Sequence, residues 1–121
     1  MLDLAIELAL KLPKRQYRYV SIITDKKDKI LSIGVNSYSK THPLQAKYAK
    51  KLNLKNKIYL HSEIYAIVKC RRNITPCKIY IARVDSLGEV KLVKPCPICS
   101  QAISDIGISE VYYTEEKKDL S

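Results

Sequence analysis

The sequence contains no tryptophan and no phenylalanine, and only two histidines and three glycines. No stretch approaches the ~18 uninterrupted apolar residues that a membrane-spanning helix needs. The apolar stretch at residues 1–12 is interrupted by Asp3 and Glu7, and no basic segment precedes it, so it lacks the pattern of a secretory leader. We therefore expect a soluble protein that stays in the cytoplasm.

Acidic residues are also few relative to basic ones. The sequence has 12 Asp and Glu and 22 Lys and Arg, which gives a formal net charge of +10. The connection between Asn36 and His61 has no acidic residue at all. It instead carries lysines interleaved with tyrosines, namely Lys40, Lys47, Lys50, Lys51, Lys55, Lys57, Tyr38, Tyr48 and Tyr59. Such a charge imbalance favours an anionic partner. The alternative is that the lysines only form a solvated face.

The length and the share of apolar residues, 46%, are typical of one globular domain, so we expect residues 1–121 to form a single domain. Apolar periodicity and turn residues predict helices and strands in alternation. The helices are expected at 2–12, 43–53, 62–72 and 95–106, and the strands at 16–24, 29–36, 78–84 and 110–114. The first two strands form an antiparallel hairpin, and the final strand–helix–strand unit makes the last two strands parallel. The sequence therefore predicts an α/β fold with a mixed sheet.

Two short motifs lie at the N-termini of predicted helices: His61-Ser62-Glu63, and Pro95-Cys96-x-x-Cys99. Cysteines at positions i and i+3 project from one side of a helical turn, and the helix dipole favours their thiolate form. Together with His61, the two thiolates would give Zn²⁺ three protein ligands. The fourth position would then hold water, which is the arrangement of a catalytic zinc site.

Glu63 lies two residues beyond His61, which is about 3 Å further along a helix at 1.5 Å per residue. It can therefore reach a bound water without acting as a ligand, and we predict that it is the catalytic acid and base. Zinc lowers the pKa of its water towards ~7, which suits attack on an amino-bearing ring carbon. The combination of H-x-E with P-C-x-x-C is the general signature of zinc-dependent nucleobase deaminases.

The cysteine motif alone has other interpretations. Cys96 and Cys99 could form half of a structural zinc site, completed by Cys70 and Cys77, but the six residues between Cys70 and Cys77 fit a zinc knuckle poorly. A thioredoxin-like redox pair would need a preceding strand that is missing here. We interpret Cys70 and Cys77 as buried small apolar residues.

Through both motifs and the predicted element order, the chain resembles the cytidine/deoxycytidylate deaminase superfamily. The segment from Ile106-Gly107-Ile108 into Val111-Tyr112-Tyr113 is more similar to the deoxycytidylate and tRNA-adenosine deaminase branch. The resemblance implies a three-layer α-β-α fold, a homo-oligomer, and a zinc-dependent hydrolase that converts a cytosine nucleotide or nucleoside to its uracil form.

The resemblance also implies substrate contacts at Asn36, Ser62 and Pro95. Asn36 follows the second strand, where the family places a substrate-binding Asn, although an Asn is also common where a strand ends in a turn. Ser62 is a departure, because the family usually has Ala at this position.

Two other functions remain open. A deaminase of cytosine or adenine in single-stranded DNA or tRNA would use the basic segment 40–57 to follow the backbone, with bases stacked on its tyrosines. The absence of Trp and Phe limits such stacking and favours a free nucleotide or nucleoside. The third possibility is a non-catalytic, zinc-stabilised nucleic-acid-binding module, against which the presence of Glu63 argues.

Overall fold

A computed structural model describes residues 1–13, 17–36, 46–47, 50, 61–70, 77–93 and 97–115. Of the helix predicted at 43–53, only Lys47, Lys50 and their neighbour at position 46 belong to the described residues, and all are helical and exposed. The remainder of that helix lies outside the described part of the chain.

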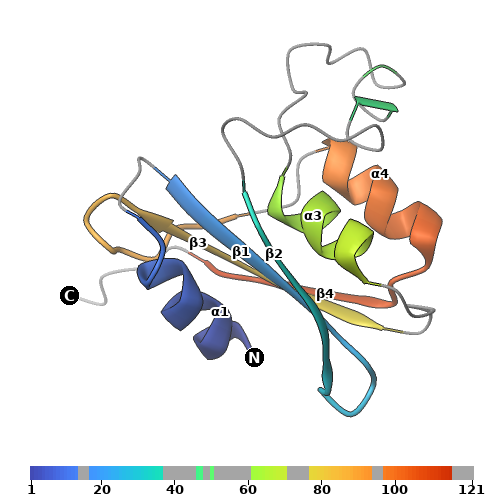
Figure 1. Ribbon diagram of the computed structural model, residues 1–121, viewed down its shortest axis with the longest axis horizontal. Coiled ribbons are helices and arrows are strands. Elements are labelled where there is room, and N and C mark those ends of the chain that lie inside the picture. Colours follow the sequence, from blue (N-terminus) through green and yellow to red (C-terminus); the bar gives the residue numbers. More distant parts are fainter. Residues whose placement is uncertain are drawn as a thin grey trace.

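The centre of the protein is a four-stranded sheet in the order β2-β1-β3-β4 (Figure 1). Its strands are β1 (Tyr17–Thr24), β2 (Ile30–Val35), β3 (Lys78–Asp85) and β4 (Glu110–Tyr113). The β1–β2 pair is antiparallel and the β3–β4 pair is parallel, which confirms both sequence predictions. The sheet is completed by antiparallel pairing of β1 with β3, which local patterns did not predict.

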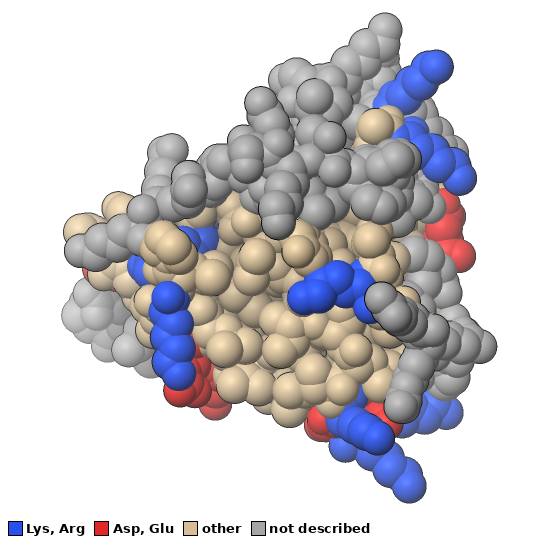
Figure 2. All heavy atoms as spheres, in the orientation of Figure 1, with Lys and Arg blue, Asp and Glu red and all other residues tan. Residues whose placement is uncertain are grey.

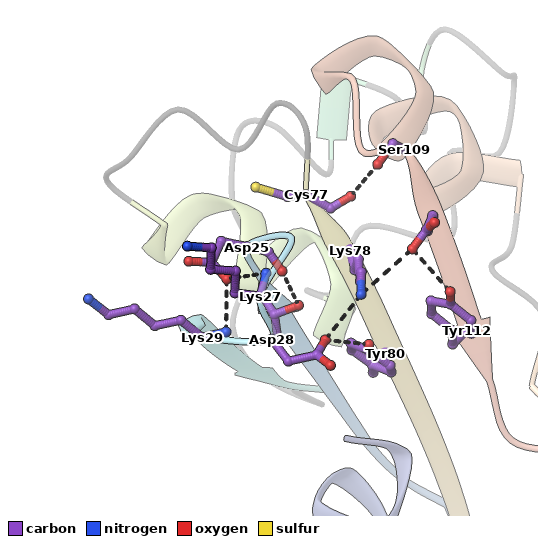
Figure 3. A network of polar contacts seen from close by, with 11 residues as sticks. Asp25, Lys27, Asp28, Lys29, Cys77, Lys78, Tyr80, Ser109 and Tyr112 are labelled. Carbon is purple, nitrogen blue, oxygen red and sulfur yellow. Dashed lines mark hydrogen bonds and ion pairs between the residues drawn. The ribbon is translucent and has the colours of Figure 1, made fainter.

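The hairpin between β1 and β2 turns tightly around Asp25 and Asp28 (Figure 3). One carboxylate oxygen of Asp25 accepts hydrogen bonds from the backbone N–H groups of Lys27 and Lys29, at 2.8 and 2.9 Å. Asp28 has a φ of 62°, a left-handed conformation that Asp tolerates better than most residues. The predicted polar turn is therefore held by its own aspartates.

Helices cover both faces of the sheet and complete the predicted three layers. Helix α1 (Leu2–Leu10) lies on one face, whereas α3 (Ser62–Lys69) and α4 (Pro97–Ile106) lie side by side on the other (Figure 1). Each face has its own apolar cluster. Ile64 and Ile67 of α3 share one buried cluster with Ile79 and Ile81 of β3.

Two helices are shorter than the sequence predicted. Helix α1 ends at Leu10, because the N–H groups of Lys11 and Leu12 bond to carbonyls three residues earlier, in a tighter turn. Helix α3 ends at Lys69 rather than at Arg72, because Cys70 already has an extended backbone. Residues 71–76 lie outside the described part of the chain. Among the described residues, no helix has the length and apolar character needed to span a membrane.

Candidate metal and proton-transfer site

The first turn of α3 presents the His61-Ser62-Glu63 motif. His61 is the N-cap residue, with an extended backbone, and its carbonyl accepts the N–H of Tyr65 at 2.9 Å. The imidazole therefore stands at the entrance of the helix and is half-buried. Glu63 follows in the first turn, where the helix dipole favours a negative charge. The helix start predicted from the sequence is confirmed.

Cys99 lies in the first turn of α4, completely buried, and brings its thiol to the same place. The distance from its Sγ to His61 Nδ1 is 3.3 Å. Two atoms that share a tetrahedral zinc at ordinary Zn–S and Zn–N lengths lie about 3.6 Å apart. The observed separation therefore fits two ligands of one zinc ion.

Glu63 completes the cluster, since one ligand atom from each of His61, Glu63 and Cys99 lies within 4.8 Å of the others. The Glu63 side chain is only 4% exposed. Cys96, the third predicted metal ligand, lies outside the described residues. The same holds for Pro95, which was predicted as a substrate contact. Of the predicted metal ligands and the predicted acid–base residue, the described part of the chain contains His61, Cys99 and Glu63, and the structure brings all three together.

Sequence reasoning missed one member of this site, Ser21 in the middle of β1. Its Oγ lies 2.7 Å from Ser62 Oγ and 3.4 Å from Glu63 Oε1, and both serine side chains are completely buried. Alternation along β1 puts Ser21 on the same face as the apolar Ile23. A serine on the core face of an otherwise apolar strand is a signal that could have found it, because buried hydroxyls need partners.

Ser62 and Asn36, two of the predicted substrate contacts, form hydrogen bonds within the protein. Ser62 donates its hydroxyl proton to Glu63 Oε1 at 2.6 Å, and its side chain is turned into the protein. Asn36 Oδ1 accepts the backbone N–H of Tyr19 at 3.0 Å, which extends the β1–β2 pairing by one residue. A substrate contact from Asn36 would therefore use its carboxamide NH₂ group. Both contacts stay predictions.

Cys70 and Cys77 do not join the cluster of ligand atoms formed by the described residues. Cys77 is buried, as predicted, and burial raises the pKa of its thiol, with a smaller contribution from Cys70. Cys70, which follows the last turn of α3, is only partly buried but packs against the same apolar cluster, so the prediction of burial holds in part for it. A structural site with four cysteines gains no support from this arrangement.

Comparison with known proteins agrees with this geometry. The model of the family described as the cytidine and deoxycytidylate deaminase zinc-binding region matches residues 1–115. The chain belongs to this family. A donor set of imidazole, thiolate and a nearby carboxylate in the region that the family uses to bind zinc fits Zn²⁺ as the cofactor.

Two individual proteins are similar to this member of the family. One is an uncharacterized deaminase in the luxG 3' region of Aliivibrio fischeri, 29% identical over an alignment of 108 residues that covers 84% of this chain. The match spans 61% of that relative's length. The other is the crystal structure of a mutant cytidine deaminase from Mycobacterium tuberculosis, 16% identical, with a TM-score of 0.52, covering 96% of this chain and 87% of that one. The second likeness concerns the fold, and confirms the predicted fold class.

Proposed function

We propose that this deaminase is a zinc-dependent hydrolase that converts a cytosine nucleotide or nucleoside to the corresponding uracil form. The observation that carries the proposal is the juxtaposition of His61 Nδ1, Cys99 Sγ and the Glu63 carboxylate at two helix N-termini. His61 and Cys99, with Cys96 as the third ligand, would hold the metal. Burial of Glu63 beside them supports a proton-transfer role.

Hydrolytic deamination consumes one water: a C–O bond forms at the amino-bearing ring carbon, the C–N bond breaks, and ammonia leaves. Zinc, when bound, supplies a water of lowered pKa as the nucleophile. Glu63 carries two protons in turn. It takes the first from the attacking water and gives it to the ring nitrogen, and then takes the second from the new hydroxyl on the ring carbon and gives it to the amine, which leaves as ammonia. Burial of Glu63 between β1 and α3 limits exchange of these protons with bulk water.

Replacing Glu63 by Gln tests the proposal. We expect the variant to retain zinc and the wild-type fold, while turnover falls by at least about 100-fold, because Gln keeps the shape but cannot move a proton. Metal analysis and product mass measure the two effects separately. Turnover within about ten-fold of wild type would rule out Glu63 as the general acid and base. Retained zinc with no turnover in the wild type, on any amino-base, would instead support the non-catalytic module.

The substrate is defined by a product assay on dCMP, CMP, deoxycytidine, cytosine, adenosine and single-stranded oligonucleotides. We expect turnover of a free cytosine compound. Activity only on oligonucleotides would favour the polynucleotide alternative. In that case, Lys→Ala variants at Lys47 and Lys50, both exposed, would each reduce the salt dependence of binding by a similar small step.

A further inference from the structure

Two buried serines from different elements converge on the Glu63 carboxylate. Ser62 Oγ lies 2.6 Å from Glu63 Oε1, and Ser21 Oγ lies 2.7 Å from Ser62 Oγ. The first distance falls in the short range of charge-assisted O–H···O⁻ hydrogen bonds. Neither serine side chain has measurable exposure to solvent. These groups therefore form a dry hydrogen-bonded chain that ends on one carboxylate oxygen.

The hydrogen bond from Ser62 to Glu63 fixes the direction of this hydrogen-bonded chain. Ser62 has one hydroxyl proton, which it donates to Glu63 Oε1, so Ser62 Oγ is the acceptor for the proton of Ser21. Among the described residues, Ser21 Oγ has hydrogen-bond contacts only with Ser62 and Glu63. Reversing the chain would exchange the 2.6 Å hydrogen bond from Ser62 to Glu63 Oε1 for the much longer 3.4 Å contact of Ser21 with the same oxygen, which is less favourable.

The elements that carry the two serines are also held rigidly relative to each other. Ser21 belongs to β1, which is hydrogen-bonded on both sides, to Gly34 of β2 and to Ile81 of β3. Gly34 in turn lies against the backbone of α3 at Ser62 and Ala66, so closely that an added Cβ atom would overlap both. The first turn of α3 thus cannot shift relative to β1 without breaking this packing.

We propose that Ser21 and Ser62 are positioning residues that hold Glu63 Oε1 as a permanent acceptor and leave Oε2 as the oxygen that carries the proton. This inference rests on the proposed function. Oε2 accepts no hydrogen bond from the described residues. Because Oε1 is occupied from the protein side, the carboxylate keeps one rotamer through the catalytic cycle.

The test compares Ser21→Ala, Ser62→Ala and the double variant with Ser32→Ala as a matched control. Ser32 is also a buried serine that donates to α3, at Ala66 O over 2.6 Å, but it does not contact Glu63. The double variant is expected to lose about 10-fold or more in kcat, the usual worth of a hydrogen bond to a charged group. Its KM should stay within about two-fold, because only transition-state interactions change. Ser32→Ala should retain wild-type kcat.

A second measurement does not depend on activity. In the zinc-loaded protein, the effect of Ser62→Ala on the unfolding equilibrium constant should differ by at least about 3-fold between the wild-type and Glu63→Gln backgrounds, since the two residues interact directly. The same comparison with Ser32→Ala should give no difference. A crystal structure of the double variant should place the Glu63 carboxylate in more than one rotamer.

The outcomes separate this inference from the proposed function. A double variant with wild-type kcat and an unchanged Glu63 rotamer would overturn the positioning role, while loss of turnover in Glu63→Gln would still support the deaminase. A rise in KM with unchanged kcat would also overturn it, and would favour the predicted substrate contact at Ser62 instead. If the wild type shows no turnover, the proposed function fails, and absence of coupling between positions 62 and 63 would then refute the positioning role independently.

Discussion

Buried polar side chains in the described part of this protein have defined hydrogen-bond partners, except at Nε of Arg18 and of Arg83. Arg18 is 5% exposed, yet its guanidinium donates to the carbonyls of Leu10 and Leu12 at the end of α1 and to that of Asp85 at the end of β3. Hydrogen bonds from a charged group to carbonyls that α1 leaves unpaired offset the cost of burying the charge. Arg18 thus joins the C-terminal end of α1 to the C-terminal end of β3.

Tyr80 is a second buried polar residue, on the α1 face at the opposite end of β3. Its hydroxyl donates to Asp28 Oδ1 over 2.7 Å, and its ring stacks on that of Tyr112 with centroids 5.0 Å apart (Figure 3). Burial, reinforced by the Asp28 carboxylate, raises the pKa of Tyr80 from 10.0 to about 12. The hydrogen bond to Tyr80 is also the main reason that the pKa of Asp28 is lowered.

These shifts predict a loss of stability at alkaline pH. The protonated phenol is favoured in the folded protein, so its contribution is complete below the unfolded pKa of 10.0 and is lost as pH rises towards about 12. Tyr80→Phe should therefore be less stable than wild type at neutral pH, and the difference should shrink between these two values. Urea unfolding as a function of pH measures it. Asp28→Asn, which keeps the left-handed turn but removes the charge, should move the loss to lower pH, and an unchanged profile in both variants would contradict the assignment.

At the scale of elements, the contact between α3 and β2 decides where the site residues stand. Gly34 permits the backbone of α3 to rest directly on the strand, against the Ser62 carbonyl and the Ala66 backbone. The same contact holds the N-terminus of α3 over Ser21. The helix is positioned by close backbone packing as much as by its apolar side chains.

Gly34→Ala tests this contact. Elsewhere in a fold, replacing Gly by Ala at an unstrained position usually stabilises a protein by about 0.4–1 kcal/mol. Here the new Cβ would overlap the Ser62 carbonyl and the Ala66 backbone, so we expect destabilisation by about 1–3 kcal/mol and reduced turnover. Chemical unfolding and kcat measure the two effects. A stabilised variant with normal turnover would show that α3 tolerates a displacement from β2.

At the scale of the whole molecule, the proposed metal site joins two helices that the sheet holds separately. His61 comes from α3 and Cys99 from α4, 38 residues apart in the chain. A metal bound by both side chains is therefore expected to stabilise the protein as well as to serve the reaction. The face shown in Figure 2 consists mostly of uncharged side chains among the described residues, with Lys or Arg side chains around its margin and also near its middle.

Removing zinc should lower the thermal stability of the whole protein. A ligand at 1,000 times its dissociation constant stabilises the folded state by about 4 kcal/mol, so a chelator should lower Tm by roughly 10–25 °C. Cys99→Ser should lose most of its zinc and most of this chelator effect. Cys70→Ser, a half-exposed cysteine outside the ligand cluster, is the matched control and should behave as wild type. Equal zinc loss in both variants would refute Cys99 as a specific ligand.

The sequence alone determined the local parts of this protein. The helix start at Ser62, the hairpin and the parallel β3–β4 pair were predicted correctly, because helix periodicity, turn residues and the handedness of strand–helix–strand units act over short stretches of chain. The position of Glu63 beside His61 follows from the rise of a single helix.

Only the tertiary structure decided that Ser21 reaches Ser62, 41 residues away. The meeting of His61 and Cys99, by contrast, was predicted from the two motifs, because both supply side chains that bind zinc. The alternation of β1 predicts which face Ser21 lies on but not which helix covers it. That partner depends on the antiparallel pairing of β1 with β3 and on the close packing of α3 at Gly34. Both are long-range contacts whose free energy comes from burial of surfaces far apart in the chain, so no local spacing encodes them.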